Sequence, residues 1–336
     1  MNILSMMSNL PGMKRKRNTS KQAEGVLVAL MLITLFASLR YDAFLSEYNI
    51  MTFLSYNSMF ILIGLGMCFV IMTGGIDLSV GSVVALSSVV VAHASPYGIE
   101  VALPVGILVG VLAGAINAFV ITKLKIVPFI ATLAMMLGAR GMALVLSDNQ
   151  SVQVSWDSNF TQFGLGKMFD FIPWPIVAML VAFVFCWILL EKFAFGRHVL
   201  SIGGNEEASK LMGLEVNKTL FGVYILSGAL AGLSGVMLAS GFGAGQPLEG
   251  LGWELSAIAA VVVGGTLLTG GLGSITSTLL GAILFGLIFN ILNFENGLGT
   301  ISFSAYWQSV IRGGFLLVVV VIQAKVINSK MRRTEF

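Results

Sequence analysis

The sequence predicts an all-α polytopic transmembrane helical bundle of about ten spans, and three observations support that prediction. The chain has 336 residues, 57% of them apolar and 10% charged, with a mean hydropathy of +0.92. An ordinary soluble domain carries roughly 25% charged residues. The apolar residues gather in runs of about 20, the length that an α-helix needs to cross a hydrocarbon core of ~30 Å. The basic residues mostly stand beside these runs.

Ten apolar runs give the expected spans. They are 22–40, 50–73, 78–95, 99–121, 127–147, 173–190, 219–241, 254–268, 274–293 and 304–326, and the eighth is short. Together they form one transmembrane domain, 22–326, between a basic tail at 1–21 and a second tail at 327–336.

Charge placement predicts that both tails lie in the cytoplasm. Lys14-Arg15-Lys16-Arg17 precede the first run, and most other Lys and Arg fall in the loops that this topology puts inside. Aromatic residues such as Tyr41, Trp174 and Trp253 fall near the expected outer ends. No convincing cleavage site follows the first run, which favours a retained span. The same basic cluster would also suit anionic lipid.

The stretch Gly74-Gly75-Ile76-Asp77-Leu78-Ser79-Val80-Gly81-Ser82 places a carboxylate between two lipid-length apolar runs. An ionisable side chain in lipid is costly unless it faces protein, a partner or water. One interpretation makes this stretch a wall or gate of a polar path through the membrane. The other makes it a turn between helices, in which Asp77 caps the next helix. The residues alone leave both open.

Two loops are long enough to have roles of their own. The outer loop, 148–172, is either a docking site for an extracytoplasmic partner or a solvated connector with a surface helix. The inner loop, 191–218, holds a predicted two-turn helix with an N-cap, an acidic first turn, an apolar stripe and a C′ glycine. This helix either pushes against a cytoplasmic motor or lies on the bilayer surface. Its residues are Gly204, Asn205, Glu206, Glu207, Ala208, Leu211, Met212 and Gly213.

Glycine patterns hint at an internal repeat. The glycines of 74–82 are echoed at 264–274, and the fourth span resembles the ninth in glycine and asparagine spacing. Inverted repeats are common in transporters, and the fourth and ninth spans would run in opposite directions. The two echoes imply different registers.

The sequence lacks the motifs of several classes of protein. The sequence has no GxxxxGK[ST] phosphate loop, HExxH, GxSxG or Cys/His cluster, which argues against an enzyme and against a cofactor or metal in this chain. Cys68 and Cys186 lie inside apolar runs, as packing residues do. A net charge of +3 beside apolar spans argues against nucleic acid. Transport is left.

Four stretches resemble the permease subunits of bacterial ATP-binding-cassette importers for monosaccharides, the family of the ribose, xylose, arabinose and galactofuranose permeases. They are GGIDLSVGS (74–82), KIVPFIATLAMMLGARG (125–141), FGRHVLSIGGNEEASKLMGLEV (195–216) and LSAIAAVVVGGTLLTGGLGS (255–274).

The resemblance implies a set of partners in the bacterial inner membrane. These are a second permease copy or paralogue, a cytoplasmic ATPase that holds ATP and Mg, and a periplasmic sugar-binding protein. It implies that the 205–213 helix couples to the ATPase, and that the paired permeases move the sugar by alternating access.

A neutral polyhydroxylated ligand needs hydrogen-bonding groups in a mostly apolar wall. The candidates for the substrate path are Asn57, Asp77, Ser79, Ser82, Asn117, Phe129, Thr132 and Asn290. Asn117 and Asn290 suit interhelical hydrogen bonds better than substrate contact. Arg140, in the fifth span, either pairs with a carboxylate or extends to the outer interface.

Two other functions stay open at this stage. In an ion-coupled secondary sugar transporter, Asp77 would carry a proton. A structural or receptor-like membrane subunit would show no flux. Neither the sugar nor the choice between homodimer and heterodimer follows from the residues.

Overall fold

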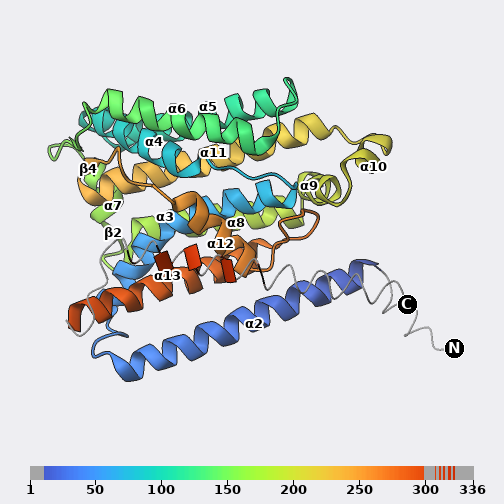
Figure 1. Cartoon of the computed structure of the whole chain (residues 1–336). Coiled ribbons are helices and arrows are strands. Elements are labelled where there is room, and N and C mark those ends of the chain that lie inside the picture. The colour runs from blue at the N-terminus through green and yellow to red at the C-terminus, as the bar shows by residue number, and fades with distance from the viewer. Residues whose placement is uncertain are drawn as a thin grey trace.

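The computed structural model describes residues 11–298 and a few residues between 307 and 321, with side chains from Glu24 onward. Nine helices of the described chain form the bundle in Figure 1. They are α2 (Pro11–Arg40), α3 (Glu47–Met72), α4 (Val80–Ala94), α5 (Ile99–Thr122), α6 (Pro128–Leu146), α8 (Trp174–Glu191), α11 (Val216–Phe242), α12 (Trp253–Val263) and α13 (Ile275–Leu298).

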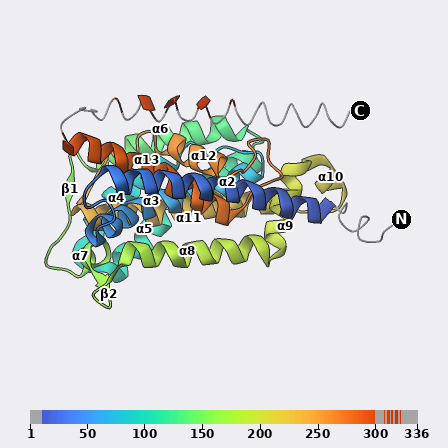
Figure 2. The ribbon, with the colours of Figure 1, turned by 90° about the horizontal axis from the view of Figure 1, so that it is seen from below.

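Short elements fill the connections. They are η1 (Ser95–Tyr97), α7 (Phe160–Leu165), α9 (Ala194–Gly204), α10 (Glu206–Leu211), β1 (Val152–Gln153), β2 (Lys167–Met168), β3 (Ile172–Pro173) and β4 (Ala244–Gly245). Strand β1 pairs antiparallel with β4, with Val152 opposite Gly245, and β2 pairs with β3, with Lys167 opposite Pro173. Both pairs lie at the end of the bundle opposite α9 and α10, which we call the strand end (Figures 1 and 2).

The helices confirm the expected class, an all-α membrane protein. Among the described residues, seven helices are long and apolar enough to cross a membrane. Helix α12 is apolar but has only 11 residues, or roughly 16 Å at about 1.5 Å per residue, so it spans about half of a ~30 Å core. The expected first span lies within α2, and the tenth, 304–326, lies mostly outside the described residues.

The core lies around α11, which packs against α3, α4 and α5. Glycine permits the closest approach: a Cβ added at Gly110 of α5 would lie 2.0 Å from the carbonyl oxygen of Gly228 on α11. Ser87 of α4 then donates a hydrogen bond to the Gly232 carbonyl at 2.8 Å. In lipid, the hydrophobic effect does not drive helices together, so their association depends on close packing. Small residues allow that packing because they let the helix backbones touch. The outward faces of α5, α6 and α8 expose large apolar side chains instead, as lipid requires.

The arrangement of elements repeats with inverted direction. Residues 47–122 form a long helix, a non-helical break, the short helix α4 and a long helix. Residues 216–298 repeat this order with α11, α12 and α13, but α3 runs toward α9 whereas α11 runs away from it (Figure 1). The fourth and ninth spans, α5 and α13, are therefore counterparts, as their glycine spacing indicates.

The glycine-cluster echo has a different explanation. A Cβ on Gly270 would lie 2.9 Å from the Gly74 nitrogen, and the Gly271 amide donates to the Met72 carbonyl at 2.9 Å. These glycine clusters are neighbours in space and not repeat counterparts. The counterpart of the 73–79 break is the 243–252 segment, so one register of five spans relates α3, α4 and α5 to α11, α12 and α13.

Candidate functional site

The polypeptide leaves helical geometry between α3 and α4, and Asp77 lies at the centre of this break. Its side chain is 1% exposed. One carboxylate oxygen, Oδ1, accepts hydrogen bonds from the Ser79 amide at 3.0 Å and from the Ser79 hydroxyl at 2.6 Å. The other, Oδ2, accepts from the Ser227 hydroxyl of α11 at 2.9 Å. The bond to the amide two residues later supports the turn, and α4 begins at Val80 with Ser79 as its N-cap.

Two further side chains extend this network, which we call the Asp77 cluster (Asp77, Ser79, Asn117, Thr132 and Ser227). The Asn117 amide nitrogen of α5 donates to the Ser79 hydroxyl at 3.0 Å. The Thr132 hydroxyl of α6 accepts from the Leu78 amide at 3.1 Å and donates to the Pro128 carbonyl at 2.9 Å. The cluster therefore joins the break to α5, α6 and α11. Within the described residues, Asp77 forms no ion pair.

Tyr224 of α11 also points into this break. Its hydroxyl is fully buried and has no hydrogen-bond partner among the described residues. A Cβ on Gly75 would lie 2.5 Å from that oxygen, so glycine leaves the room that the phenol occupies. Sequence reasoning missed Tyr224 and Ser227. The available signal was the series of hydroxyl and small residues along α11, among them Ser227, Gly228 and Ser234.

The second break, 243–252, meets the first turn of α4. A Cβ on Gly81 would lie 2.1 Å from the Gly250 carbonyl oxygen and 2.9 Å from a carboxylate oxygen of Glu254. The amino-terminal ends of α4 and α12 therefore approach each other inside the bundle. Arg140 of α6 holds this segment by donating to the backbone carbonyls of Pro247 and of Glu249, the latter at 2.6 Å. Neither interpretation of Arg140 from the sequence named backbone carbonyls.

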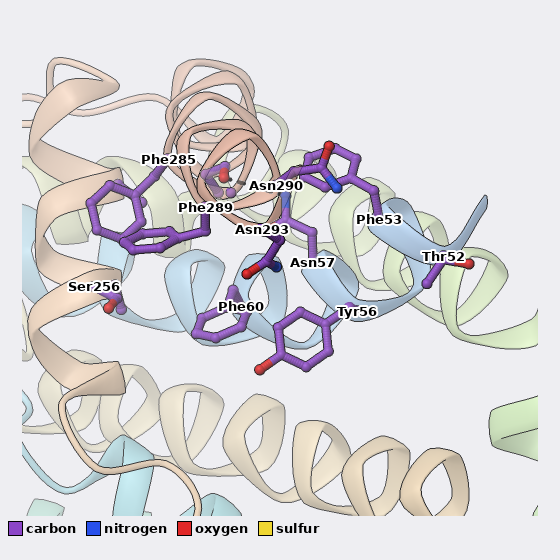
Figure 3. Close-up of a pocket in the computed structure, with 14 residues that line it drawn as sticks. Thr52, Phe53, Tyr56, Asn57, Phe60, Ser256, Phe285, Phe289, Asn290 and Asn293 are labelled. Carbon is purple, nitrogen blue, oxygen red and sulfur yellow. Dashed lines mark hydrogen bonds between the residues drawn. The ribbon is translucent and has the colours of Figure 1, made fainter. Parts of the chain in front are cut away.

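A cavity of about 300 Å³ lies between α3, α12 and α13, and we call it the α3–α13 pocket (Figure 3). Asn57 lies in its wall and donates through Nδ2 to the Ala282 carbonyl at 3.3 Å. Asn290 exchanges two hydrogen bonds with Asn49, at 3.0 and 3.3 Å, which link α13 to α3. The lining residues are Thr52, Phe53, Tyr56, Asn57, Phe60, Ser256, Ala257, Ala260, Ala282, Phe285, Gly286, Phe289, Asn290 and Asn293.

The structure thus divides the candidate path residues into two groups. The Asp77 cluster holds Asp77, Ser79, Asn117 and Thr132, whereas the α3–α13 pocket holds Asn57 and Asn290. Ser82 is buried in the first turn of α4, close to the first group in sequence. Phe129 is 49% exposed at the start of α6 and does not line the pocket.

The expected helix of the inner loop is present as α10. Asn205 is its N-cap and accepts a hydrogen bond from the Ala208 amide at 2.9 Å. Gly213 has φ +81°, and the amides of Gly213 and Leu214 bond to the carbonyls of Lys210 and Ser209, which completes a Schellman motif. Leu211 and Met212 are 90% and 69% exposed, so the bundle leaves this apolar pair uncovered.

The observations define a class first. A bundle of apolar helices with two breaks inside it, both held by buried polar groups, is typical of multi-pass membrane transport proteins. A family model described as "Branched-chain amino acid transport system / permease component" matches residues 49–320, and the chain belongs to this family. It is therefore a permease subunit of the bacterial inner membrane, and its family consists of transport components rather than enzymes.

The chain is also similar to permeases named for sugars. It is 40% identical to the ribose import permease protein RbsC of Bacillus subtilis over 307 residues, which cover 90% of this chain and 93% of the relative. It is 37% identical to RbsC of Escherichia coli K12, with coverage of 89% and 92%. It is 35% identical to the D-allose transport system permease protein AlsC of Escherichia coli K12, with coverage of 88% and 89%. These relatives confirm the resemblance. No solved structure gives a significant match.

Proposed function

We propose that the chain is the transmembrane permease of an ATP-binding-cassette importer that carries a pentose or hexose into the cell by alternating access. The single observation that supports this most is the 35–40% identity, over almost the whole length of both chains, to permeases named for ribose and allose. The aligned region includes the breaks, both groups of candidate path residues and α10.

The topology that we propose has ten spans with both termini in the cytoplasm. The seven long apolar helices, α2, the short α12 and a tenth span at 304–326 would make up this number. Lys192, Arg197, Lys210 and Lys218 all belong to the end that carries α9 and α10, which the positive-inside rule assigns to the cytoplasm. The transmembrane domain is then 22–326, with the 148–172 loop in the periplasm and the 191–218 loop inside.

The energy for transport would come from partners. The chain has no phosphate loop, so ATP and Mg would be bound by a separate cytoplasmic ATPase. Helix α10 suits the contact with that ATPase because it is fixed by both caps and presents Leu211 and Met212 outward. A second copy or a paralogue of this permease and a periplasmic sugar-binding protein complete the proposed assembly.

The two breaks would provide the moving parts. Helices interrupted inside the membrane change direction without unravelling a whole span, and the breaks of transporters commonly surround the transported solute. The Asp77 cluster holds one break against three helices, and Arg140 holds the other. We therefore propose that Asp77, Ser79, Ser82, Asn117 and Thr132 shape the path rather than bind the sugar.

Uptake by the reconstituted complex tests this proposal. Proteoliposomes are prepared with the permease in the membrane, its ATPase and ATP inside, and its binding protein outside. They should accumulate labelled ribose, allose or arabinose, and vesicles without ATP should not. The purified permease alone should hydrolyse no ATP. Uptake that needs no ATPase but stops when the proton gradient is dissipated would overturn the proposal in favour of an ion-coupled transporter that uses Asp77. Absence of flux for every monosaccharide would also overturn it.

A further inference from the structure

The α3–α13 pocket lies between three helices of the chain and has the size of a small-ligand site. Its volume of about 300 Å³ is at the lower end of the roughly 300–1,000 Å³ that ligand pockets occupy. We propose that this pocket binds one neutral sugar ring, with Phe60, Phe285 and Phe289 against the face of the ring and Asn57 as the polar contact. This inference rests on the proposed function and adds a binding site to it.

The charge of the pocket decides between two ligand classes. Its 14 lining residues include no Lys, Arg, His, Asp or Glu. The description of the family names amino acids, which carry an ammonium and a carboxylate group. In this pocket neither group would have a charged partner, so burying them would cost a large desolvation free energy. A sugar carries neither charge. The lining therefore suits a neutral polyhydroxylated ligand.

The aromatic side chains suit the flat, apolar face of a sugar ring. Phe285 and Phe289 lie one turn apart on α13 with ring centroids 5.1 Å apart at 67°. Phe60 of α3 packs on Trp253 at 4.3 Å between centroids, which fixes its orientation. Figure 3 shows the rings of α13 and those of Tyr56 and Phe60 on α3 bordering the same cavity. Burying C–H groups against these rings removes apolar surface from water, while the hydroxyl groups stay at the edges.

Asn57 supplies the polar selectivity. Its side chain is 3% exposed, and its Nδ2 is bonded to the Ala282 carbonyl, whereas its Oδ1 accepts no hydrogen bond from the described residues. A sugar hydroxyl can donate to that oxygen. Gly286 preserves the geometry, because a Cβ there would lie 2.5 Å from Asn57 Oδ1. Asn290 has a structural role instead, because its side-chain amide already exchanges two hydrogen bonds with the side-chain amide of Asn49.

A groove lies next to the pocket, toward the strand end of the bundle. This groove, of about 840 Å³, lies among α3, α7, α8 and α11, with Glu47 and Lys167 in its lining. It shares Thr52 and Tyr56 with the α3–α13 pocket. The Tyr56 ring lies 5.5 Å from Phe60 and 6.2 Å from Phe242, so it stands at the junction of the two spaces. In this proposal, a ligand that enters from the strand end would follow one face of α3 and pass Tyr56 on its way to the pocket.

Uptake kinetics with a matched pair of variants test the pocket in the reconstituted complex. Phe289→Leu should raise the KM for ribose uptake by about tenfold, since an aromatic contact contributes on the order of 1.5 kcal/mol, while ATP hydrolysis stimulated by the binding protein persists. Phe294→Leu is the control on the same helix, because Phe294 packs on Tyr41 and Phe44 away from the pocket. Equal kinetics for the two variants would overturn the inference.

Cysteine protection gives a measurement that does not depend on Phe289→Leu being stable. The two native cysteines, Cys68 and Cys186, are fully buried, so a Thr52→Cys variant should provide the reactive thiol. Millimolar ribose should slow its alkylation by a small polar maleimide. Alkylation at the same rate with and without ribose, in a complex that imports ribose, would overturn the pocket and leave the proposed function standing. Wild-type complex that imports no sugar would overturn the proposed function itself.

Discussion

The two inverted repeats meet at two equivalent contacts, α5 against α11 and α13 against α3, which differ in how tightly they are packed. On the α4 side, Gly110 and Gly114 of α5 meet the backbone of α11, so that added Cβ atoms would lie 2.0 and 2.3 Å from its carbonyl oxygens. On the α12 side, the corresponding contact between α13 and α3 contains the rings of Phe285 and Phe289 and a cavity of about 300 Å³. The same topology thus gives a closed half and an open half.

The difference follows from side-chain size and hydrogen bonding. Glycine lets α5 and α11 touch, and the Asp77 cluster then fills the break beside them with bonded polar groups. Phenylalanine holds α13 away from α3, and the asparagines at that interface bond only at the edges of the gap. The comparison teaches that the same inverted topology gives one contact filled by backbone and bonded polar groups and another that leaves a cavity.

The largest expected effect comes from forcing the closed half apart. Gly110→Leu would push α5 off α11, and we expect a loss of stability above about 3 kcal/mol, because the clash is with backbone. The measurement is the amount of protein extracted from membranes and its unfolding midpoint in detergent. Gly138→Leu on α6 is the control, since no heavy atom lies within 4 Å of its added Cβ. Equal behaviour of the two variants would contradict the tight packing.

A smaller effect is expected from removing the acceptor at the first break. Asp77→Ala leaves the Ser79 amide and the Ser79 and Ser227 hydroxyls without their partner, which should cost about 2–4 kcal/mol. The unfolding midpoint and ATP-driven uptake should both fall. Asp157→Ala removes an exposed carboxylate and should change neither. Wild-type stability and uptake for Asp77→Ala would show that the cluster is incidental.

The smallest effect is expected at the unpaired hydroxyl. Tyr224→Phe removes a buried group without a partner, so stability should stay constant or rise by up to about 1 kcal/mol. Tyr41→Phe is the comparison, because the Tyr41 hydroxyl donates to Glu295 at 2.6 Å and its loss should cost about 1 kcal/mol. A clear loss of stability or transport in Tyr224→Phe would mean that this hydroxyl finds a partner in another conformation.

The sequence predicts features whose causes are local. Lipid demands apolar runs of a fixed length, so the helices fall close to the expected spans. Helix α10 is fixed by Asn205 and Gly213, both of which lie within two residues of its ends. The resemblance is confirmed because it rests on motifs that can be compared directly. The roles of the candidate path residues stay predictions.

Features that depend on distant residues could not be predicted in the same way. Asp77 and Ser227 are 150 positions apart, and no local pattern connects them. The glycine clusters at 74 and 270 share a pattern because they pack together, which the sequence alone cannot tell from a repeat. The partners of Arg140 are backbone carbonyls, which every residue carries, so residue types give no signal for them.

The meeting of α4 and α12 at Gly81 and Gly250 has a consequence for the bilayer. Helix α4 runs from this contact to the strand end, and α12 runs from it to the α9 end. In the ten-span topology that we propose, the two leaflets would therefore enclose different sets of helices, with α4 in the leaflet at the strand end and α12 in the leaflet at the α9 end.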